Sequence, residues 1–300
     1  MLDGPAARHM SASTFILGMT LPGDSISMRF YTDIIAAEDT GESQYHRWSE
    51  QSVQSFWKLW TSNPFLKRQF YPLTYWQDLL AWAKQRLPET PSVVVDVGCG
   101  NGNLVVCLQE AFGKATIVGV DLTEESLTGA RQRFQQEPNV SFQVGSLTAL
   151  PFSNGTVDLV TCTEVLEHTF PDVFAHSFAE VSRVLKVGGY YLASVPFNEP
   201  AYFVCCPGCH EVFTPYQHMN FEITYDDIRN RLTATGLELV AFFTPADQSP
   251  SRSAATGTLK RVLKPILLRQ FPALAARLFP KAGVTGFFAR KVSEQPVTTR

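Results

Sequence analysis

The chain has 300 residues, of which 45% are apolar and 18% charged, and its formal net charge is −3. This is the mix of an ordinary globular protein with room for one large α/β domain and additions, and the charge argues against a nucleic-acid partner. No apolar run reaches the roughly 18 residues of a membrane-spanning helix. The six cysteines do not form the pattern of a disulfide framework, so we expect a reducing, cytoplasmic location.

The N-terminal part is predicted to be a flexible tail, residues 1–44, followed by a helical segment, residues 45–90. Aromatic side chains crowd this segment, and apolar residues at Trp76, Leu79 and Leu80 follow helical spacing. Prolines interrupt it, so several short helices are expected. We interpret the segment as part of a lid over a binding site.

From residue 91 to residue 245 strands and helices alternate. Val93–Val97 is an unbroken apolar run apart from one aspartate, typical of a strand covered on both faces. Further strands are predicted at 116–120, 140–144, 157–161, 190–195, 237–243 and 286–292. Helices are predicted at 104–112, 124–136, 173–185 and 225–235, the third ending in a C-cap at Gly188 and Gly189. The alternation indicates a mostly parallel, doubly wound sheet.

A glycine-rich turn directly follows the first strand of this core. Glycines recur as Gly98-x-Gly100-x-Gly102, where they let the backbone turn sharply and approach a ligand closely. Asp121 ends the next strand, where a carboxylate can accept hydrogen bonds from both hydroxyls of a ribose. The spacing differs from the GxGxxG of a dinucleotide-binding fold, which argues against a nicotinamide cofactor.

Four successive segments carry a resemblance to a known family. They are VVVDVGCGNGNL at 93–104, IVGVDLTEESL at 117–127, VSFQVGSLTALPFSNGTVDLV at 140–160, and CTEVLEHTFPD at 162–172 with EVSRVLKVGGYYLASVP at 180–196. In order and spacing they resemble the class I S-adenosylmethionine-dependent methyltransferases of the small-molecule type. The resemblance implies a Rossmann-like, seven-stranded, mostly parallel sheet with helices on both faces and an antiparallel last strand. It also implies S-adenosyl-L-methionine as the cofactor.

By that resemblance, the glycine turn and the ends of the following strands bind the cofactor. The expected cofactor-binding residues are Asp96, Gly98, Cys99, Gly100, Asn101, Gly102, Asp121, Leu122, Ser146, Leu147 and Thr163. Asp96 is expected to organise the turn and Asp121 to hold the ribose. Ser146 departs from the family, which usually has an acid there. A hydroxyl can accept a hydrogen bond from the adenine amino group, but without charge assistance, so we expect a lower cofactor affinity.

Candidate catalytic residues follow the fourth and fifth strands. Glu164, Glu167 and His168 match a Glu-His pair that is often structural in the family, so a structural role and contact with the substrate both stay open. His218 begins a segment similar to one that faces the acceptor pocket in the family, and a role at the entry of the next helix is the alternative. A general base is needed only if the acceptor loses a proton, as a hydroxyl does.

The stretch CCPGCH over 205–210 contains a single CxxC pair. No metal is assigned, because Cys206, Cys209, His210 and His218 would supply the four ligands of a zinc site only if the loop folds back. A loop with exposed thiols, or a redox-active pair, is the alternative.

Residues 246–284 are interpreted as a basic amphipathic helical insert, followed by the final strand and tail, residues 285–300. From Arg252 onward the chain has ten lysines and arginines and one acid, Glu294. Through residues 259–279 such a helix can lie on an anionic membrane, or it can dock with its basic face in solvent. With the aromatic segment it is expected to form the lid that selects the acceptor.

The sequence thus predicts a methyltransferase that acts on a small-molecule acceptor, with residues 91–245 as the cofactor-binding core. Two alternatives stay open. One is a nucleotide-dependent oxidoreductase on a similar sheet. The other is a non-catalytic cofactor-binding module of the same fold, to which Ser146 would point. Neither the acceptor nor the oligomeric state follows from the sequence.

Overall fold

The computed structural model describes residues 48–63, 73–197, 199, 203–205, 212–243 and 285–294. Its helices are α2 (Glu50–Ser62), α3 (Leu73–Lys84), α4 (Asn103–Phe112), α5 (Glu124–Arg133), α6 (Pro171–Val184) and α7 (Tyr225–Ala234), with short 3-10 turns η2 (Leu166–His168) and η3 (Pro215–Gln217). Its strands are β1 (Val93–Val97), β2 (Thr116–Asp121), β3 (Val140–Val144), β4 (Val157–Thr163), β5 (Leu185–Val195), β6 (Val204–Cys205), β7 (Val212–Phe213), β8 (Leu237–Phe243) and β9 (Thr285–Lys291).

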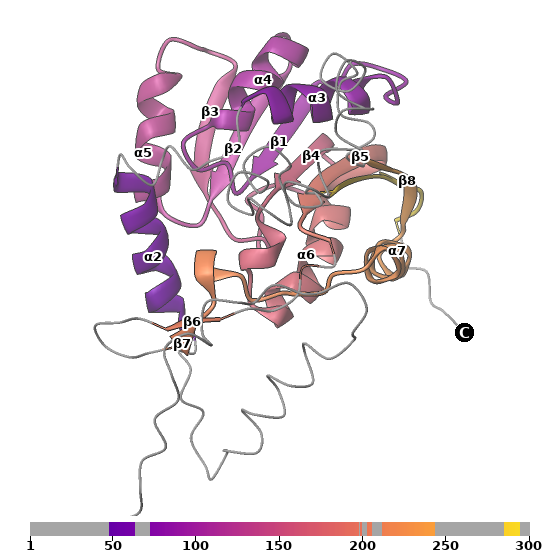
Figure 1. Ribbon diagram of the computed structural model, residues 1–300. Helices are drawn as coiled ribbons and strands as arrows, with labels where there is room; N and C mark the ends of the chain where they lie inside the picture. The colour runs from indigo at the N-terminus through magenta and orange to yellow at the C-terminus, as the bar shows by residue number, and fades with distance from the viewer. Residues whose placement is uncertain are drawn as a thin grey trace, which may run out of the picture. The chain divides into compact units, whose positions relative to one another are not determined.

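Seven of these strands form one sheet, in the order β3-β2-β1-β4-β5-β9-β8 (Figure 1). The first five strands of that order pair in parallel, and β9 runs antiparallel to both β5 and β8. The prediction of a mostly parallel sheet with an antiparallel last strand is confirmed. The strand order reverses between β1 and β4, and ligands of open α/β sheets bind beyond the carboxyl ends of the strands at such a point.

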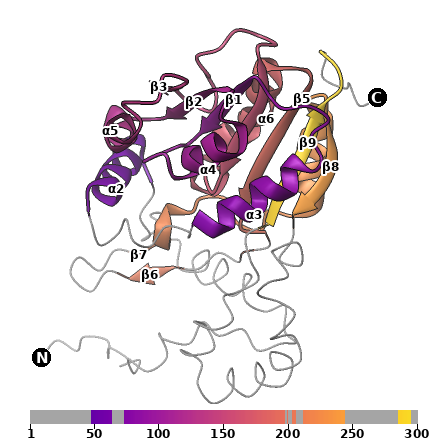
Figure 2. The same ribbon diagram turned by 90° about the horizontal axis from the view of Figure 1, so that it is seen from above.

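Helices cover both faces of the sheet, and each face has its own apolar core (Figure 2). On one face α3, α4 and α5 pack through residues such as Leu79 and Leu127, and on the other α6 and α7 pack through residues such as Phe178 and Ile228. Successive strand residues point to opposite faces. The central strands are therefore apolar almost throughout, as predicted for Val93–Val97.

Helix α2 lies alongside α5 at one edge of the fold (Figures 1 and 2). It begins with a capping box, in which the Ser49 side chain accepts from Ser52 N while the Ser52 side chain accepts from Ser49 N. An ion pair of 3.4 Å between Lys58 Nζ and Glu125 Oε1 joins the two helices. Both of its side chains are more than half exposed, so this pair contributes little to the docking of α2 on α5.

The helix before β5 ends without a glycine cap, so that prediction was wrong. Helix α6 passes directly into β5 at Leu185, and Gly188 and Gly189 lie inside the strand. The pairing of β4 with β5 shifts register between Val157 and Leu159, and Gly188 near this irregularity has a φ of +87°. A glycine suits a strand irregularity as well as a helix end, and the sequence alone did not distinguish the two.

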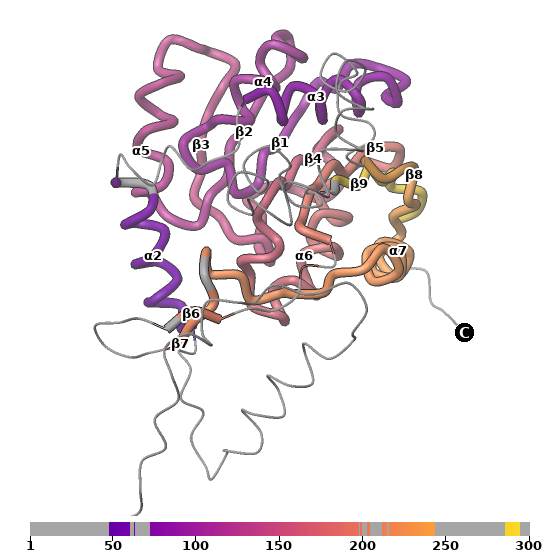
Figure 3. The backbone as a smooth tube through the Cα atoms, viewed as in Figure 1, coloured from indigo at the N-terminus to yellow at the C-terminus, as the bar shows by residue number. Residues whose placement is uncertain are grey.

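Strands β6 and β7 pair with each other as a two-stranded antiparallel ladder in a separate compact unit. The sequence did not predict them. The predicted tail 1–44, the basic insert with its segment 259–279, and the residues Cys206, Cys209 and His210 lie outside the described residues (grey in Figure 3). Among the helices that are described, none has the length and apolar character to cross a bilayer.

Candidate active site

The turn after β1 contains glycines in left-handed backbone conformations, with φ of +71° at Gly98 and +48° at Gly100. The N–H groups of Gly98 and Cys99 donate to the carbonyl of Val120 at 2.7 and 3.1 Å, which ties the turn to the end of β2. A Cβ on Gly98 would lie 2.3 Å from Val165 Cγ2, whereas one on Gly100 would meet nothing within 4 Å. The turn is therefore packed on one side and presents bare backbone on the other.

Asp121, at the end of β2, braces this turn. Its Oδ2 accepts from Gly100 N at 2.9 Å, and its Oδ1 accepts from Leu122 N at 2.9 Å. Burial raises the pKa of Asp121, and the hydrogen bonds from the backbone oppose that shift. The side chain of Ser126 and the backbone of Thr123 also hydrogen-bond to this carboxylate, so it is held firmly in place where it lines the cavity.

Asp96 is a second carboxylate under the turn, and it is only 2% exposed. Its Oδ1 accepts from Thr161 Oγ1 at 2.8 Å, but its Oδ2 has no hydrogen-bond partner among the residues that the structure describes. Burial raises the pKa of Asp96 to about 7, against the hydrogen bond from Thr161 and with a contribution from the charge of Asp121. A ligand that brings a cation or an N–H donor would satisfy this oxygen.

A cavity of about 870 Å³ opens beyond the carboxyl ends of β1, β2 and β4. One part is lined by the glycine turn, Asp121 and residues 145–148. The other part is lined by residues that follow β4 and β5, among them Glu164, Glu167, His168, Glu199, Tyr216 and His218. Helix α2 adds apolar and aromatic side chains, which are Val53, Phe56, Trp57 and Trp60. The volume is that of a small-molecule site.

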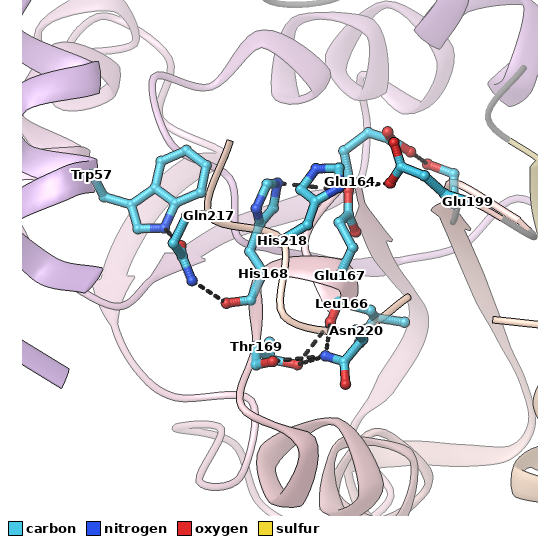
Figure 4. Close-up of polar contacts among 11 residues, drawn as sticks. Trp57, Glu164, Leu166, Glu167, His168, Thr169, Glu199, Gln217, His218 and Asn220 are labelled. Carbon is cyan, nitrogen blue, oxygen red and sulfur yellow. Dashed lines mark hydrogen bonds and ion pairs between the residues drawn. The ribbon is translucent and has the colours of Figure 1, made fainter. Parts of the chain in front are cut away.

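The 3-10 turn η2 brings Glu167 and His168 next to His218 (Figure 4). His168 Nε2 lies 3.6 Å from Glu167 Oε1, and the rings of His168 and His218 meet edge to face with centroids 4.7 Å apart. His218 Nδ1 lies 2.7 Å from Glu199 Oε2. A carboxylate oxygen accepts in such a pair, so Nδ1 is the donor to Glu199.

Burial dominates the ionisation of this cluster. It raises the pKa of Glu167 well above the usual range, and the charge of Glu164 adds to the shift. It lowers the pKa of His168 to about 3, and His218 adds to that shift. His168 is therefore neutral near neutral pH. Glu167 Oε2 and His168 Nδ1 are buried without a hydrogen-bond partner in the described part of the chain, so both can engage a ligand.

A buried glutamine connects α2 to this cluster. Gln217 Oε1 accepts from Trp57 Nε1 at 2.6 Å, and Gln217 Nε2 donates to the carbonyl of His168 at 2.7 Å (Figure 4). Asn220 continues the support, because its Nδ2 donates to the carbonyls of Leu166 and Thr169 at 2.9 and 2.7 Å. These hydrogen bonds fix the backbone around His168 from both sides.

Glu164 follows β4 with a left-handed φ of 56°, which is costly for a residue other than glycine. Its N–H donates to the carbonyl of Ser194 at 3.0 Å, and its Oε1 accepts from Ser194 Oγ at 2.8 Å. The end of β5 thus holds the Glu164 side chain at the cavity.

All the residues expected to bind the cofactor line the cavity except Gly102, and so do Glu164, His168 and His218. Gly102 instead begins α4 with a φ of +74°, and a Cβ there would lie 2.8 Å from Phe134 Cε2. Ser146 Oγ accepts from Thr148 N at 3.3 Å, so this hydroxyl has a local partner as well as access to the cavity.

Sequence reasoning missed Trp57, Gln217 and Glu199 as site residues. Trp57 lay in the aromatic segment that was expected to form a lid, but nothing in the sequence distinguished it from its aromatic neighbours. Gln217 is 160 positions away from its partner Trp57. The position of Gln217 directly before His218 was the only local signal available.

Residues 94–189 match the family model described as a methyltransferase domain. Over this segment the chain is similar to methyltransferases. Among solved structures, a methyltransferase from Haloferax volcanii in complex with the Trm112 activator has the same fold, with a TM-score of 0.56 and 21% identity. The match covers 79% of this chain and 98% of that one.

Two further relatives illustrate the range of this family. A ubiquinone biosynthesis O-methyltransferase of Thiobacillus denitrificans is 32% identical over 136 residues, which cover 44% of this chain and 57% of the relative. The structure of the Burkholderia thailandensis 1,6-didemethyltoxoflavin-N1-methyltransferase, with its substrate and S-adenosylhomocysteine bound, gives a TM-score of 0.53 at 17% identity. This match covers 80% of this chain and 87% of the toxoflavin enzyme. The chain thus spans little more than half the length of that curated relative.

Proposed function

We propose that this protein transfers a methyl group from S-adenosyl-L-methionine to a small-molecule acceptor. The observation that carries the proposal is that one cavity joins the glycine turn and Asp121 to a cluster of two histidines and three glutamates. The first part suits the cofactor and the second suits an acceptor. The named activities of the ubiquinone and toxoflavin enzymes support a small organic acceptor over a macromolecule.

The residues of the first part fit the cofactor. Asp121 presents a carboxylate at the cavity, which suits the hydroxyls of a ribose, and the partnerless Oδ2 of Asp96 suits the cofactor's ammonium group. Bare backbone at Gly100 allows close approach. When bound, S-adenosyl-L-methionine supplies a methyl group activated by its sulfonium.

The chain's own residues then position the acceptor and exclude water. The apolar and aromatic side chains of α2 close one side of the cavity, η2 places His168 against the acceptor, and the turn after η3 places His218 there. His218, oriented by Glu199 through Nδ1, is the candidate general base for an acceptor that must lose a proton. His168, whose pKa is lowered to about 3, is a neutral hydrogen-bonding group rather than a cation.

The test begins with calorimetric titration of S-adenosylhomocysteine and of NAD against the full chain. We expect binding of the first and none of the second, and the reverse would favour an oxidoreductase. Asp121→Ala should weaken S-adenosylhomocysteine binding by about 1–3 kcal/mol, the cost of removing a buried hydrogen-bonding group. Glu238→Ala, which removes an exposed carboxylate on β8, is the matched control.

Turnover is tested with radiolabelled S-adenosylmethionine against a metabolite panel, followed by mass analysis of the labelled product. His218→Asn should lower kcat by about 10²–10⁴-fold for an acceptor that loses a proton, with S-adenosylhomocysteine affinity unchanged. Tight cofactor binding without turnover on any acceptor would favour a non-catalytic module.

A further inference from the structure

We propose that the acceptor end of the cavity is built for an organic cation, and that the methyl acceptor is an amine protonated in free solution. This deepens the proposed function, on which it rests, by naming the acceptor class. Among the described residues the cavity lining contains carboxylates and neither lysine nor arginine. The acids are Glu50, Asp96, Asp121, Glu164, Glu167 and Glu199.

Three of these acids lie close to the two histidines (Figure 4), namely Glu164, Glu167 and Glu199. Glu167 is 1% exposed, and its Oε2 and the neighbouring His168 Nδ1 lack hydrogen-bond partners within the described ranges. Buried acceptors without donors are costly. A ligand ammonium offers several N–H donors and a positive charge, so it satisfies both atoms, whereas an anionic ligand would be repelled.

Aromatic rings stand beside these carboxylates. Trp57 meets the His168 ring edge to face at 4.8 Å between centroids, and Trp60 meets Tyr216 at 6.0 Å. All four rings line the cavity. Aromatic faces attract organic cations and also cover the apolar part of such a ligand. Carboxylates together with tryptophan rings thus favour an ammonium group carried on an apolar body.

The movement of positive charge during methyl transfer also favours an amine as the acceptor. His218 Nε2 takes a proton from the bound ammonium, which leaves a neutral amine with a lone pair. That lone pair forms the N–CH₃ bond while the CH₃–S bond of the donor breaks and its electron pair stays on sulfur. Positive charge therefore passes from sulfur to the product nitrogen, beside Glu164, Glu167 and Glu199. Carboxylates placed where positive charge develops stabilise the transition state, but they would oppose an anionic oxygen nucleophile.

The proposal is tested by binding three probes of similar size to the full chain saturated with S-adenosylhomocysteine, in the presence of EDTA. The probes are 2-phenylethylamine, 2-phenylethanol and 3-phenylpropionate. We expect the amine to bind at least about tenfold more tightly than the alcohol, and the carboxylate to bind most weakly. Glu167→Gln should remove most of this preference. Glu199→Gln serves as a second variant where the first does not fold, and Glu238→Gln should leave the preference unchanged.

Equal or tighter binding of the alcohol or the carboxylate would overturn the proposal, as would an amine preference that survives both Glu167→Gln and Glu199→Gln. A titration with Zn²⁺ in the absence of EDTA supplies a further check. Tight binding of one ion, abolished by Glu167→Gln, would assign the cluster to a metal and also overturn the proposal. The titration with S-adenosylhomocysteine alone comes first. Its failure would contradict the methyltransferase function, and the amine preference could still be measured on the free protein.

Discussion

Gly98 and Gly100 share left-handed backbone angles but have different surroundings, which makes them a matched pair. Gly100→Ala should lower the free energy of unfolding by about 1–2 kcal/mol, the cost of a left-handed alanine. It should also weaken S-adenosylhomocysteine binding, because its methyl group would enter open space at the cavity. Gly98→Ala adds a collision with Val165 and should cost more stability. Urea unfolding and calorimetry measure both effects, and equal destabilisation by the two variants would contradict the packing described here.

The buried Asp96 carboxylate should make stability depend on pH in a specific direction. Its pKa is raised to about 7 in the folded protein from an ordinary 3.8, so the folded state holds a proton that the unfolded chain releases. The stability contributed by this group is therefore fully present below its unfolded pKa and is lost as the pH rises toward its folded pKa. Relative to Asp96→Asn, the wild-type protein should lose up to about 4 kcal/mol between about pH 4 and about pH 7.

Urea unfolding of both proteins across this range checks the expectation, since other titrating groups cancel in the difference. A difference that stays flat with pH would show that Asp96 is ionised in the folded protein. Bound S-adenosylhomocysteine should reduce the slope, because its ammonium group favours the charged carboxylate.

At the scale of elements, η3 joins α2 to η2 through a single side chain. Gln217 is fully buried, accepts from Trp57 and donates to the His168 carbonyl. A double-mutant cycle of Trp57→Phe and Gln217→Leu should give a coupling of about 1 kcal/mol in the free energy of unfolding. Trp57→Phe combined with Asn220→Leu provides the control, because Trp57 and Asn220 share no hydrogen bond. Additivity of Trp57→Phe and Gln217→Leu would mean that the hydrogen bond does not hold α2.

The sequence identified most elements because their signals are local. The glycine turn, the strand before it and the carboxylate of Asp121 could be placed because a turn and a strand end depend on neighbouring residues. The helix cap predicted at Gly188 was wrong because its outcome does not depend on neighbouring residues. Whether a glycine ends a helix or lies at a strand irregularity depends on pairing between β4 and β5, which are separated by α6. Strand pairing across a helix has no signature in neighbouring residues.

At the scale of the whole molecule, one part of the cavity has local sequence signals, and the other part depends on contacts between distant residues. The part near the glycine turn could be predicted, since its residues belong to short segments with recognisable spacing. The acid–histidine part could be predicted only for Glu164, Glu167, His168 and His218. Glu199 reaches His218 across 19 positions, and the turns that bring them together have no periodic pattern. Tertiary packing alone determines those contacts.

The cavity is lined by loops from both sides of the point where the strand order reverses. A ligand bound there should therefore stabilise the whole sheet. Loops after β1 and β2 form one side, and those after β4 and β5 form the other. At a free concentration of one hundred times its Kd, S-adenosylhomocysteine should raise the free energy of unfolding by about 2.7 kcal/mol. For a chain of this size that corresponds to a Tm increase of about 4 °C. NAD should cause no increase, and Asp121→Ala should need a higher S-adenosylhomocysteine concentration for the same shift. A thermal scan that shows two transitions, of which the ligand moves only one, would contradict the single cooperative unit.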